Sequence, residues 1–227
     1  MIAGGATAVA EAPESLAERY ARMAHVDEGR GIDIPLRGLD IVLSGLALLI
    51  LSPVLLVVAA SIAISSGRPV LYHGRRVGKA GRVFGMYKFR TLAADAETRL
   101  GPYLGAELTR RTEDEVTRIG RALRAIHLDE VPQLWNVLRG DMSVVGPRPI
   151  RPAFFEELCE RIPQYWQRLV VRPGVTGLAQ VRLTREDDWA DKLSHDMEYI
   201  ADRSVSLYLR VAMVTAVRMV RRTFRRG

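Results

Sequence analysis

The sequence predicts an α+β fold, in which an N-terminal membrane segment precedes a mostly helical domain with one small β-hairpin. Residues 41–67 carry no charged side chain over 27 positions, and about 20 apolar residues suffice to span a bilayer core. Residues 70–90 hold two β-rich runs around a glycine-containing turn, which is typical of a hairpin. Beyond residue 90, apolar residues recur at helical spacing. The 227 residues are 48% hydrophobic, which suits one domain with an extension and excludes a disordered chain.

The composition restricts the partners and the compartment. Thirty-three Lys and Arg against 26 Asp and Glu give a net charge of +7. This charge favours an anionic partner, which could be nucleic acid, a phosphorylated ligand or an anionic membrane surface. The single cysteine, Cys159, excludes a disulfide framework and a multi-thiolate metal site. The chain therefore suits a reducing compartment.

Residues 1–30 are interpreted as an extension and residues 31–68 as the membrane segment. The hydropathy alone fits a single-pass anchor. Pro53, however, removes a backbone hydrogen bond near the middle of the run, so two helical arms could meet at a bend. An arm over 41–52 would rise about 18 Å, short of a ~30 Å hydrocarbon core, which would make the segment a re-entrant helix. Ser52 could then donate a hydrogen bond to the carbonyl that Pro53 leaves without a donor.

Basic residues gather after the membrane segment and at the C-terminus. Residues 68–90 contain seven Lys and Arg, residues 210–227 contain six Arg, and neither range contains an acid. The part after the membrane segment is therefore expected on the cytoplasmic side. Both ranges could lie against anionic headgroups, and ordinary solvated faces or a phosphate-binding surface are the alternatives.

The remaining domain, 69–227, contains six helical patterns after the hairpin and ends in a basic helix. In the last pattern Val211, Val214, Val217 and Phe224 interleave with arginines, which favours a helix lying at the membrane interface. The predicted helices cover residues 91–100, 115–126, 130–139, 153–166, 186–202 and 205–224.

The candidate chemistry centres on two adjacent carboxylates, Asp129 and Glu130. Pro132 fits only the first turn of the helix that follows, so Asp129 is placed close to a helix N-terminus. That position favours a carboxylate and could also receive a phosphate. Asp129 is thus either an ordinary helix N-cap or part of a reactive site.

Three arginines accompany these carboxylates: Arg124, Arg148 and Arg172. The guanidinium fork suits phosphate oxygens. Two adjacent carboxylates would repel a diphosphate unless arginines and a divalent cation offset their charge, and hard oxygen ligands favour Mg²⁺ over zinc. His127 is interpreted as an ordinary packing or surface residue.

Taken together, these pieces resemble a bacterial sugar transferase family, the monotopic phosphoglycosyl transferases, or polyprenyl-phosphate glycosyl-1-phosphate transferases. The resemblance covers about residues 34–222, and it is specific because every piece occurs in order. It looks like the small form, with the re-entrant helix and the catalytic domain. The matching pieces are Arg37 with Asp40, Ser52-Pro53, YKFRT at 87–91, TRIGRALR at 117–124, LDEVPQLWNVLRGDMSVVGPRP at 128–149 and VRPGVTGLAQV at 171–181.

The resemblance implies a cytoplasmic catalytic domain at the bacterial inner membrane, held by a re-entrant helix that begins at Arg37 and Asp40 and breaks at Ser52-Pro53. It implies a Mg²⁺-dependent enzyme that transfers a sugar 1-phosphate from a UDP-sugar to polyprenyl (undecaprenyl) phosphate and releases UMP. This reaction would be the first membrane step in assembling a glycan, exopolysaccharide, lipopolysaccharide or glycoconjugate.

The resemblance also implies roles for individual residues. Asp129 would attack the β-phosphorus and carry a covalent phosphosugar. Asp129 and Glu130 would hold Mg²⁺. Contacts with the nucleotide or its phosphates are implied for Arg124, Arg148, Arg172 and Lys88.

Residues 182–188 depart from the family pattern, in which a small residue and then Gly-Arg-Asn commonly follow LAQV. This range often frames the sugar end of the site, so the resemblance does not identify the sugar. Two non-enzymatic alternatives remain: a noncatalytic membrane-anchored scaffold, and a nucleic-acid- or polyphosphate-binding protein. The 7% aromatic content argues against a nucleic-acid partner, and a homo-oligomer is left open.

Overall fold

The computed structural model describes residues 30–100, 105–183 and 188–224. The predicted extension therefore lies outside the described residues except for Arg30. Most of the changed 182–188 range and the last three residues lie outside them as well. The predicted class is confirmed: the molecule is mostly helical, with one antiparallel hairpin and one long apolar helix near its start.

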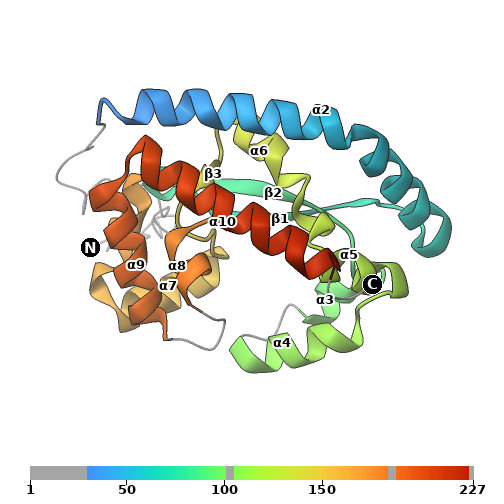
Figure 1. Cartoon of the computed structure of the whole chain (residues 1–227). Coiled ribbons are helices and arrows are strands. Elements are labelled where there is room, and N and C mark those ends of the chain that lie inside the picture. Colours follow the sequence, from blue (N-terminus) through green and yellow to red (C-terminus); the bar gives the residue numbers. More distant parts are fainter. Residues whose placement is uncertain (1–29, 101–104, 184–187, 225–227) are drawn as a thin grey trace, which may run out of the picture.

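The long helix is α2 (Asp33–Ser66), which contains Pro53 in its interior. Among the described residues it is the one helix long and apolar enough to cross a membrane. Its later part turns away from the direction of its first part (Figure 1). Ser52 Oγ donates a 2.8 Å hydrogen bond to the carbonyl of Leu49, which is the carbonyl that an N–H at position 53 would otherwise bond. The compensation predicted for Ser52 is thus confirmed.

The predicted hairpin is confirmed. Strands β1 (Leu71–Val77) and β2 (Val83–Phe89) pair antiparallel around the short 3-10 turn η1 (Lys79–Gly81). Tyr72 lies opposite Lys88, and Arg76 lies opposite Phe84. Because side chains alternate along a strand, Tyr72, Arg76 and Lys88 share one face of the hairpin.

Three short helices follow the hairpin: α3 (Ala96–Leu100), α4 (Gly105–Asp114) and α5 (Arg118–Ala125). The helix predicted from residue 91 begins later because the carbonyl of Thr91 accepts the backbone N–H of Thr117. Thr117 in turn caps α5 by accepting a hydrogen bond from Gly120 N. A Cβ on Gly120 would lie 2.1 Å from the Thr91 carbonyl oxygen, so glycine permits this close approach of α5 to the end of β2. Helix α4 has no counterpart among the predicted helices.

The middle of the domain brings two turns together through a short parallel strand pair that the sequence pattern did not indicate. The turn η2 (Leu128–Glu130) and helix α6 (Gln133–Arg139) lead into β3 (Ser143–Val145), which pairs with β4 (Gly174–Thr176). A Cβ on Gly174 would lie 2.1 Å from the backbone nitrogen of Gly146. The turns that carry Arg148 and Arg172 therefore lie backbone against backbone.

Four helical elements form the next part of the domain: α7 (Pro152–Arg161), η3 (Pro163–Val170), α8 (Leu178–Arg182) and α9 (Trp189–Asp202). The single helix predicted over 153–166 is divided because Pro163 interrupts the hydrogen-bond ladder after α7. A buried ion pair of 2.7 Å between Arg168 and Asp196 joins η3 to α9. An edge-to-face contact between Phe155 and Trp166, with ring centroids 5.0 Å apart, belongs to the core between α7 and η3.

The last helix, α10 (Val205–Phe224), matches the predicted range and runs beneath α2 in Figure 1. Tyr208 and Val211 are buried against the domain. The sequence pattern counts Val211 among the apolar residues of an interfacial helix, but its side chain packs into the core of the domain instead. The exposed apolar side chains recur every four residues instead: Val205, Leu209, Met213 and Val217. The side chain of Phe224 lies outside the description.

Two polar residues in the first turns of helix α2, Arg37 and Asp40, bind it to the centre of the domain. Arg37 donates hydrogen bonds of 2.6 and 2.8 Å to the carbonyls of Val137 and Leu138, and so caps the C-terminal end of α6. Asp40 is only 2% exposed. It accepts hydrogen bonds from three donors, namely Ser143 Oγ, Val144 N and Tyr208 Oη. These contacts fix the direction of α2 relative to α6, β3 and α10.

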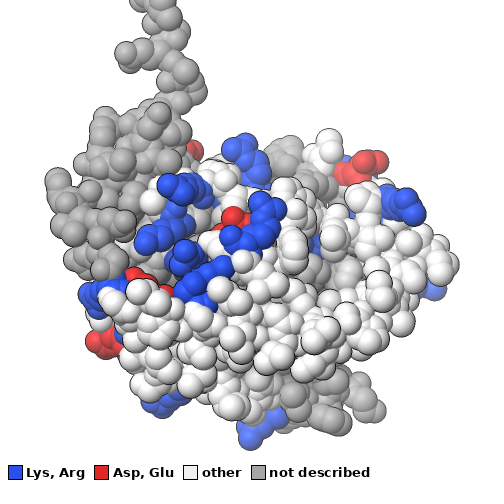
Figure 2. Space-filling model, turned by 90° about the horizontal axis from the view of Figure 1, so that it is seen from above, with Lys and Arg blue, Asp and Glu red and all other residues white. Residues whose placement is uncertain are grey.

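The opposite side of α2 is a continuous exposed apolar surface, called here the outer face. A globular protein rarely leaves so many large apolar side chains in water, so this surface indicates contact with a membrane or a partner. Seen from above, the face that carries α2 shows a wide area without charged residues, beside which Lys and Arg side chains gather (Figure 2). The outer face comprises Ile41, Val42, Leu46, Leu49, Ile50, Val54, Leu56, Val57 and Ile64.

Candidate active site

Asp129 and Glu130 lie in the η2 turn between α5 and α6. Pro132 is the N-cap of α6, and no side chain caps that helix. The helix-cap interpretation of Asp129 is therefore wrong. His127 begins the turn in the left-handed region, with φ 59°. A non-glycine residue is strained in that conformation, and such strain gathers at functional sites.

Glu130 is held beside the hairpin by Lys88, whose Nζ lies 2.5 Å from Glu130 Oε1. The backbone fixes this pairing through Asn136 of α6. The Asn136 side chain accepts a 2.9 Å hydrogen bond from Tyr87 N and donates one of 2.7 Å to the carbonyl of Gly85. Strand β2 and helix α6 are thereby joined at Gly85 and Tyr87, just before Lys88. The resemblance implied a site role for Lys88, and the structure places this residue against the acidic pair.

The two carboxyl groups differ in acidity. Burial raises the pKa of Asp129 above its ordinary value, and the neighbouring Glu130 raises it further, although Lys88 and Arg124 act in the opposite direction. Burial would also raise the pKa of Glu130, but the charges of Lys88 and Arg148 outweigh that effect and lower it to about 2. Glu130 is thus an anion at any ordinary pH, and Asp129 is the more basic carboxylate of the two.

Arg124 approaches this pair from the last turn of α5. Its Nε donates a 2.9 Å hydrogen bond to Thr91 Oγ1, and its charge acts on Asp129. The structure therefore brings Arg124, Lys88, Asp129 and Glu130 together, as the resemblance implied. The contact with Thr91 depends on the close approach that Gly120 permits.

A cavity of about 180 Å³ opens beside Glu130. Its wall has a strongly basic part, formed by Arg76, Lys88, Arg148 and Arg151, and an aromatic part, formed by Phe154 and Trp189. The two aromatic rings meet edge to face with centroids 5.2 Å apart. Several cations around one carboxylate fit a ligand with more than one negative charge, and the aromatic edge fits a flat or apolar group attached to it.

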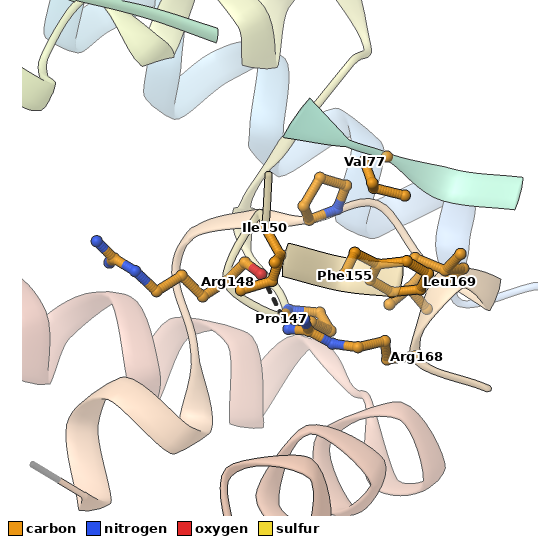
Figure 3. Close-up of a pocket in the computed structure, with 10 residues that line it drawn as sticks. Val77, Pro147, Arg148, Ile150, Phe155, Arg168 and Leu169 are labelled. Carbon is orange, nitrogen blue, oxygen red and sulfur yellow. Dashed lines mark hydrogen bonds between the residues drawn. The ribbon is translucent and has the colours of Figure 1, made fainter. Parts of the chain in front are cut away.

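Arg148 and Arg172 differ in what their side chains contact. In Figure 3 the Arg148 side chain points away from Phe155 and Leu169. The carbonyl of Arg148 accepts a 2.9 Å hydrogen bond from Arg168, which fixes the turn while the guanidinium reaches the basic cavity. Arg172 does not line that cavity. Its Nε donates a 2.8 Å hydrogen bond to the carbonyl of Gly140, at the end of α6.

The sequence pattern of the family described as "Bacterial sugar transferase" matches residues 33–222, a range that includes α2, the acidic pair and the basic cavity. The chain belongs to this bacterial sugar transferase family. The resemblance drawn from the sequence motifs is thereby confirmed.

Several curated relatives are similar to this sugar transferase. One is the UDP-N-acetylgalactosamine-undecaprenyl-phosphate N-acetylgalactosaminephosphotransferase of Aeromonas hydrophila, 40% identical over 64% of this chain and 34% of the relative. Another is the UDP-glucose:undecaprenyl-phosphate glucose-1-phosphate transferase of Caulobacter vibrioides, 41% identical over 65% of this chain and 55% of the relative. The exopolysaccharide production protein PSS of Rhizobium leguminosarum bv. phaseoli is 39% identical over 66% of this chain and 76% of the relative. The chain thus spans about a third of the first relative and about half of the second.

Two cavity residues of this family member, Arg76 and Arg151, were not among the candidates from the sequence. Burial, together with the neighbouring charges of Arg151 and Arg148, lowers the pKa of the Arg76 guanidinium. The three guanidinium groups therefore sit close together. Two signals could have indicated them: Arg76 lies on the same hairpin face as Lys88, and Arg151 follows Arg148 in the same proline-bounded turn.

The side chains around the acidic pair include oxygen donors of the kind that Mg²⁺ prefers. Among the described residues no group of three or more His, Cys, Asp or Glu side chains comes together. Mg²⁺ commonly binds one or two protein carboxylates and completes its shell with water and substrate phosphates. Asp129 and Glu130 supply such a pair of hard oxygen donors, so the residues fit a magnesium ion that binds together with a diphosphate.

Proposed function

We propose that this sugar transferase moves a sugar 1-phosphate from a UDP-sugar to a polyprenyl phosphate, such as undecaprenyl phosphate, and releases UMP. The proposal rests on the acidic pair of η2, in which Glu130 lines a cavity together with three arginines and a lysine and Asp129 is its neighbour in the same turn. The names of two relatives support it, because they specify a UDP-sugar and an undecaprenyl-phosphate acceptor.

Asp129 acts as the nucleophile in this proposal. Its carboxylate oxygen forms a bond to the β-phosphorus of the UDP-sugar, and the bond from that phosphorus to the bridging oxygen of the diphosphate breaks. UMP leaves with the bonding electrons, and the sugar phosphate remains on Asp129 as an acyl phosphate. A phosphate oxygen of the acceptor then attacks the same phosphorus, and Asp129 leaves as a carboxylate. The raised pKa of Asp129 suits it to attack, because the more basic carboxylate is the better nucleophile.

The basic side chains hold and neutralise the phosphates. Lys88 keeps Glu130 ionised and in place, while Arg76, Arg148 and Arg151 bind the diphosphate and the departing UMP. Asp129 and Glu130 would hold Mg²⁺, which when bound supplies further neutralisation of the phosphate charge. Phosphoryl transfer depends mostly on such positioning and charge compensation.

Helix α2 places this chemistry at the membrane. In this proposal α2 enters and leaves the bilayer by the cytoplasmic face of the inner membrane, bending near Pro53, with its outer face in contact with lipid. One substrate is soluble and the other is a lipid whose phosphate stays at headgroup depth. An enzyme joining them must hold its site at that depth, and attachment of α2 to α6 through Arg37 does so.

The sugar is not assigned, because the relatives act on different sugars. Their names specify N-acetylgalactosamine and glucose. The changed 182–188 range precedes Trp189, which lines the cavity. We therefore expect this range to influence which sugar is accepted.

Purified full-length chain in lipid nanodiscs tests the activity directly. A panel of UDP-sugars is offered with polyprenyl phosphate and Mg²⁺, and UMP release is measured. We expect UMP release that depends on both acceptor and chain with at least one sugar. Equal, background-level release with every sugar would contradict the enzyme and favour the noncatalytic scaffold.

A further inference from the structure

Trp135 is exposed to an unusual degree for a tryptophan in this fold. Its side chain is 53% exposed on α6, and it is the only aromatic among the large exposed hydrophobic side chains of the described residues. Of the other tryptophans, Trp166 is buried in the core, and Trp189 lines the basic cavity. The fold thus leaves one indole facing outward, on the helix that directly follows the acidic pair.

The position of Trp135 follows from how α6 is packed. The buried residues of α6 are Gln133, Asn136 and Val137, and Asn136 faces β2. Helix α6 also packs against α2, which lies directly above it in Figure 1. Helix α6 is thus covered by β2 and by α2, and its remaining side is exposed. Trp135 and Arg139, one helical turn apart, occupy that exposed side.

We propose that Trp135 inserts into the boundary between headgroups and acyl chains of the phospholipid bilayer, beside α2. The indole combines a large apolar surface with one N–H donor, so it is stable where an apolar and a wet environment meet. Arg37 joins α6 directly to α2, the helix that carries the apolar outer face. Trp135 thus extends the same lipid-facing surface.

The contact of Trp135 with the bilayer would fix how far the acidic pair lies from the membrane surface. Trp135 follows Glu130 by five residues, and a helix rises about 1.5 Å per residue, so the acidic pair lies within roughly 10 Å of the indole along the chain direction. A bilayer contact at Trp135 therefore holds the pair within reach of a phosphate at headgroup level. This consequence rests on the proposed function, whereas the contact itself does not.

Fluorescence quenching tests the contact. Full-length chain and W135F are bound to vesicles of anionic phospholipid without UDP-sugar or acceptor, and the difference between their emissions reports Trp135. We expect strong quenching of the difference emission by lipids brominated near the headgroup end of the acyl chain. Quenching should be weaker with bromine near the chain end. W189F provides the matched control, because the difference emission of the cavity residue Trp189 should be insensitive to both lipids.

An unchanged difference emission for Trp135 in brominated vesicles would overturn the proposal. Stronger quenching by bromine near the chain end would also overturn it, since the indole would then lie too deep. Because no substrate is present, these results do not depend on whether the proposed reaction occurs.

Steady-state kinetics test whether the bilayer contact of Trp135 positions the acidic pair for the lipid acceptor. W135S should raise the KM for polyprenyl phosphate several-fold and leave the KM for the UDP-sugar unchanged. W135F should stay close to the unaltered chain, because phenylalanine keeps an apolar ring at that place. An effect of W135S on the UDP-sugar KM alone would contradict the positioning role.

Discussion

Asp129 and Glu130 are neighbours in sequence but meet different surroundings. Glu130 faces Lys88 at 2.5 Å and is held as an anion, with its pKa lowered to about 2. Asp129 is 8% exposed, and burial raises its pKa. The fold thus separates a permanently charged carboxylate, suited to holding a cation, from a more basic one, suited to attack. The sequence indicates the pair, but only the packing of β2 against α6 separates their roles.

The pH dependence of the reaction should respond to Lys88. The proposed attack requires Asp129 in its ionised form, so kcat/KM should fall as the pH drops through the pKa of Asp129. Lys88 is one of the charges that lower this pKa. Lys88→Met should therefore raise it and move the acidic limb of the profile to higher pH, besides lowering the rate. The limb is measured from kcat/KM for the UDP-sugar across the acidic range.

Lys88→Arg is the matched control, because it keeps the positive charge and should leave the limb near its original pH. An acidic limb at the same pH in the Lys88→Met and Lys88→Arg proteins would contradict the assignment of this limb to Asp129.

Substitution of Arg148 should mainly affect UMP binding, whereas substitution of Arg172 should mainly affect thermal stability. Arg148 reaches the cavity with an exposed side chain, so Arg148→Gln should weaken UMP binding about 10- to 100-fold, the cost of one charge-assisted hydrogen bond. The Tm should remain unchanged. Arg172 bonds the carbonyl of Gly140, so Arg172→Gln should lower the Tm by several degrees and leave the UMP affinity nearly intact. Calorimetric titration with UMP and thermal unfolding are the measurements, and the reverse pattern would show that the two roles are exchanged.

At the scale of elements, the sequence indicates regular patterns well and long-range pairings poorly. The hairpin, α10 and the position of the α2 bend follow from strand alternation, helical periodicity and Pro53. The parallel pair of β3 and β4 does not, because each strand has three residues and its partner lies about 30 residues away. The cavity arginines Arg76 and Arg151 were likewise not predicted from the sequence. Their approach depends on contacts between distant segments.

Labelling the two ends of α2 tests whether both lie on the same side of the membrane. If α2 is a hairpin bent at Pro53, single cysteines at positions 30 and 70 should both react with a membrane-impermeant thiol reagent from the cytoplasmic side. The native Cys159 is buried and should contribute little background. Pro53→Leu restores an N–H for the Leu49 carbonyl and should straighten the helix, so that the two labels become accessible from opposite sides.

Ser52 and Ser61 form a matched pair for the same helix. Both hydroxyls donate 2.8 Å hydrogen bonds to helix carbonyls, but only Ser52 serves the carbonyl that Pro53 leaves without a donor. Ser52→Ala should destabilise the bent form more than Ser61→Ala, measured as the labelled fraction at each end. Opposite-side labelling of the unaltered chain would contradict the hairpin.

At the scale of the whole molecule, the membrane helix and the site form one unit. Asp40 and Arg37 attach the start of α2 to β3, α6 and α10. Helix α6 in turn carries Asn136, which fixes β2 and Lys88. The sequence indicates the family residues Arg37 and Asp40 without their purpose. The structure shows that they set the orientation of the membrane helix relative to the acidic pair.

In the proposed mechanism Asp129 carries the sugar phosphate between the two steps, so the covalent intermediate should be detectable. Full-length chain is incubated with a UDP-sugar that supports UMP release and with Mg²⁺, but without acceptor, and its peptides are analysed by mass spectrometry. We predict a sugar phosphate adduct on the peptide that contains Asp129, which disappears when polyprenyl phosphate is added and never forms in Asp129→Asn. Full turnover by Asp129→Asn, or transfer of the sugar phosphate to the acceptor without any adduct, would contradict the covalent mechanism.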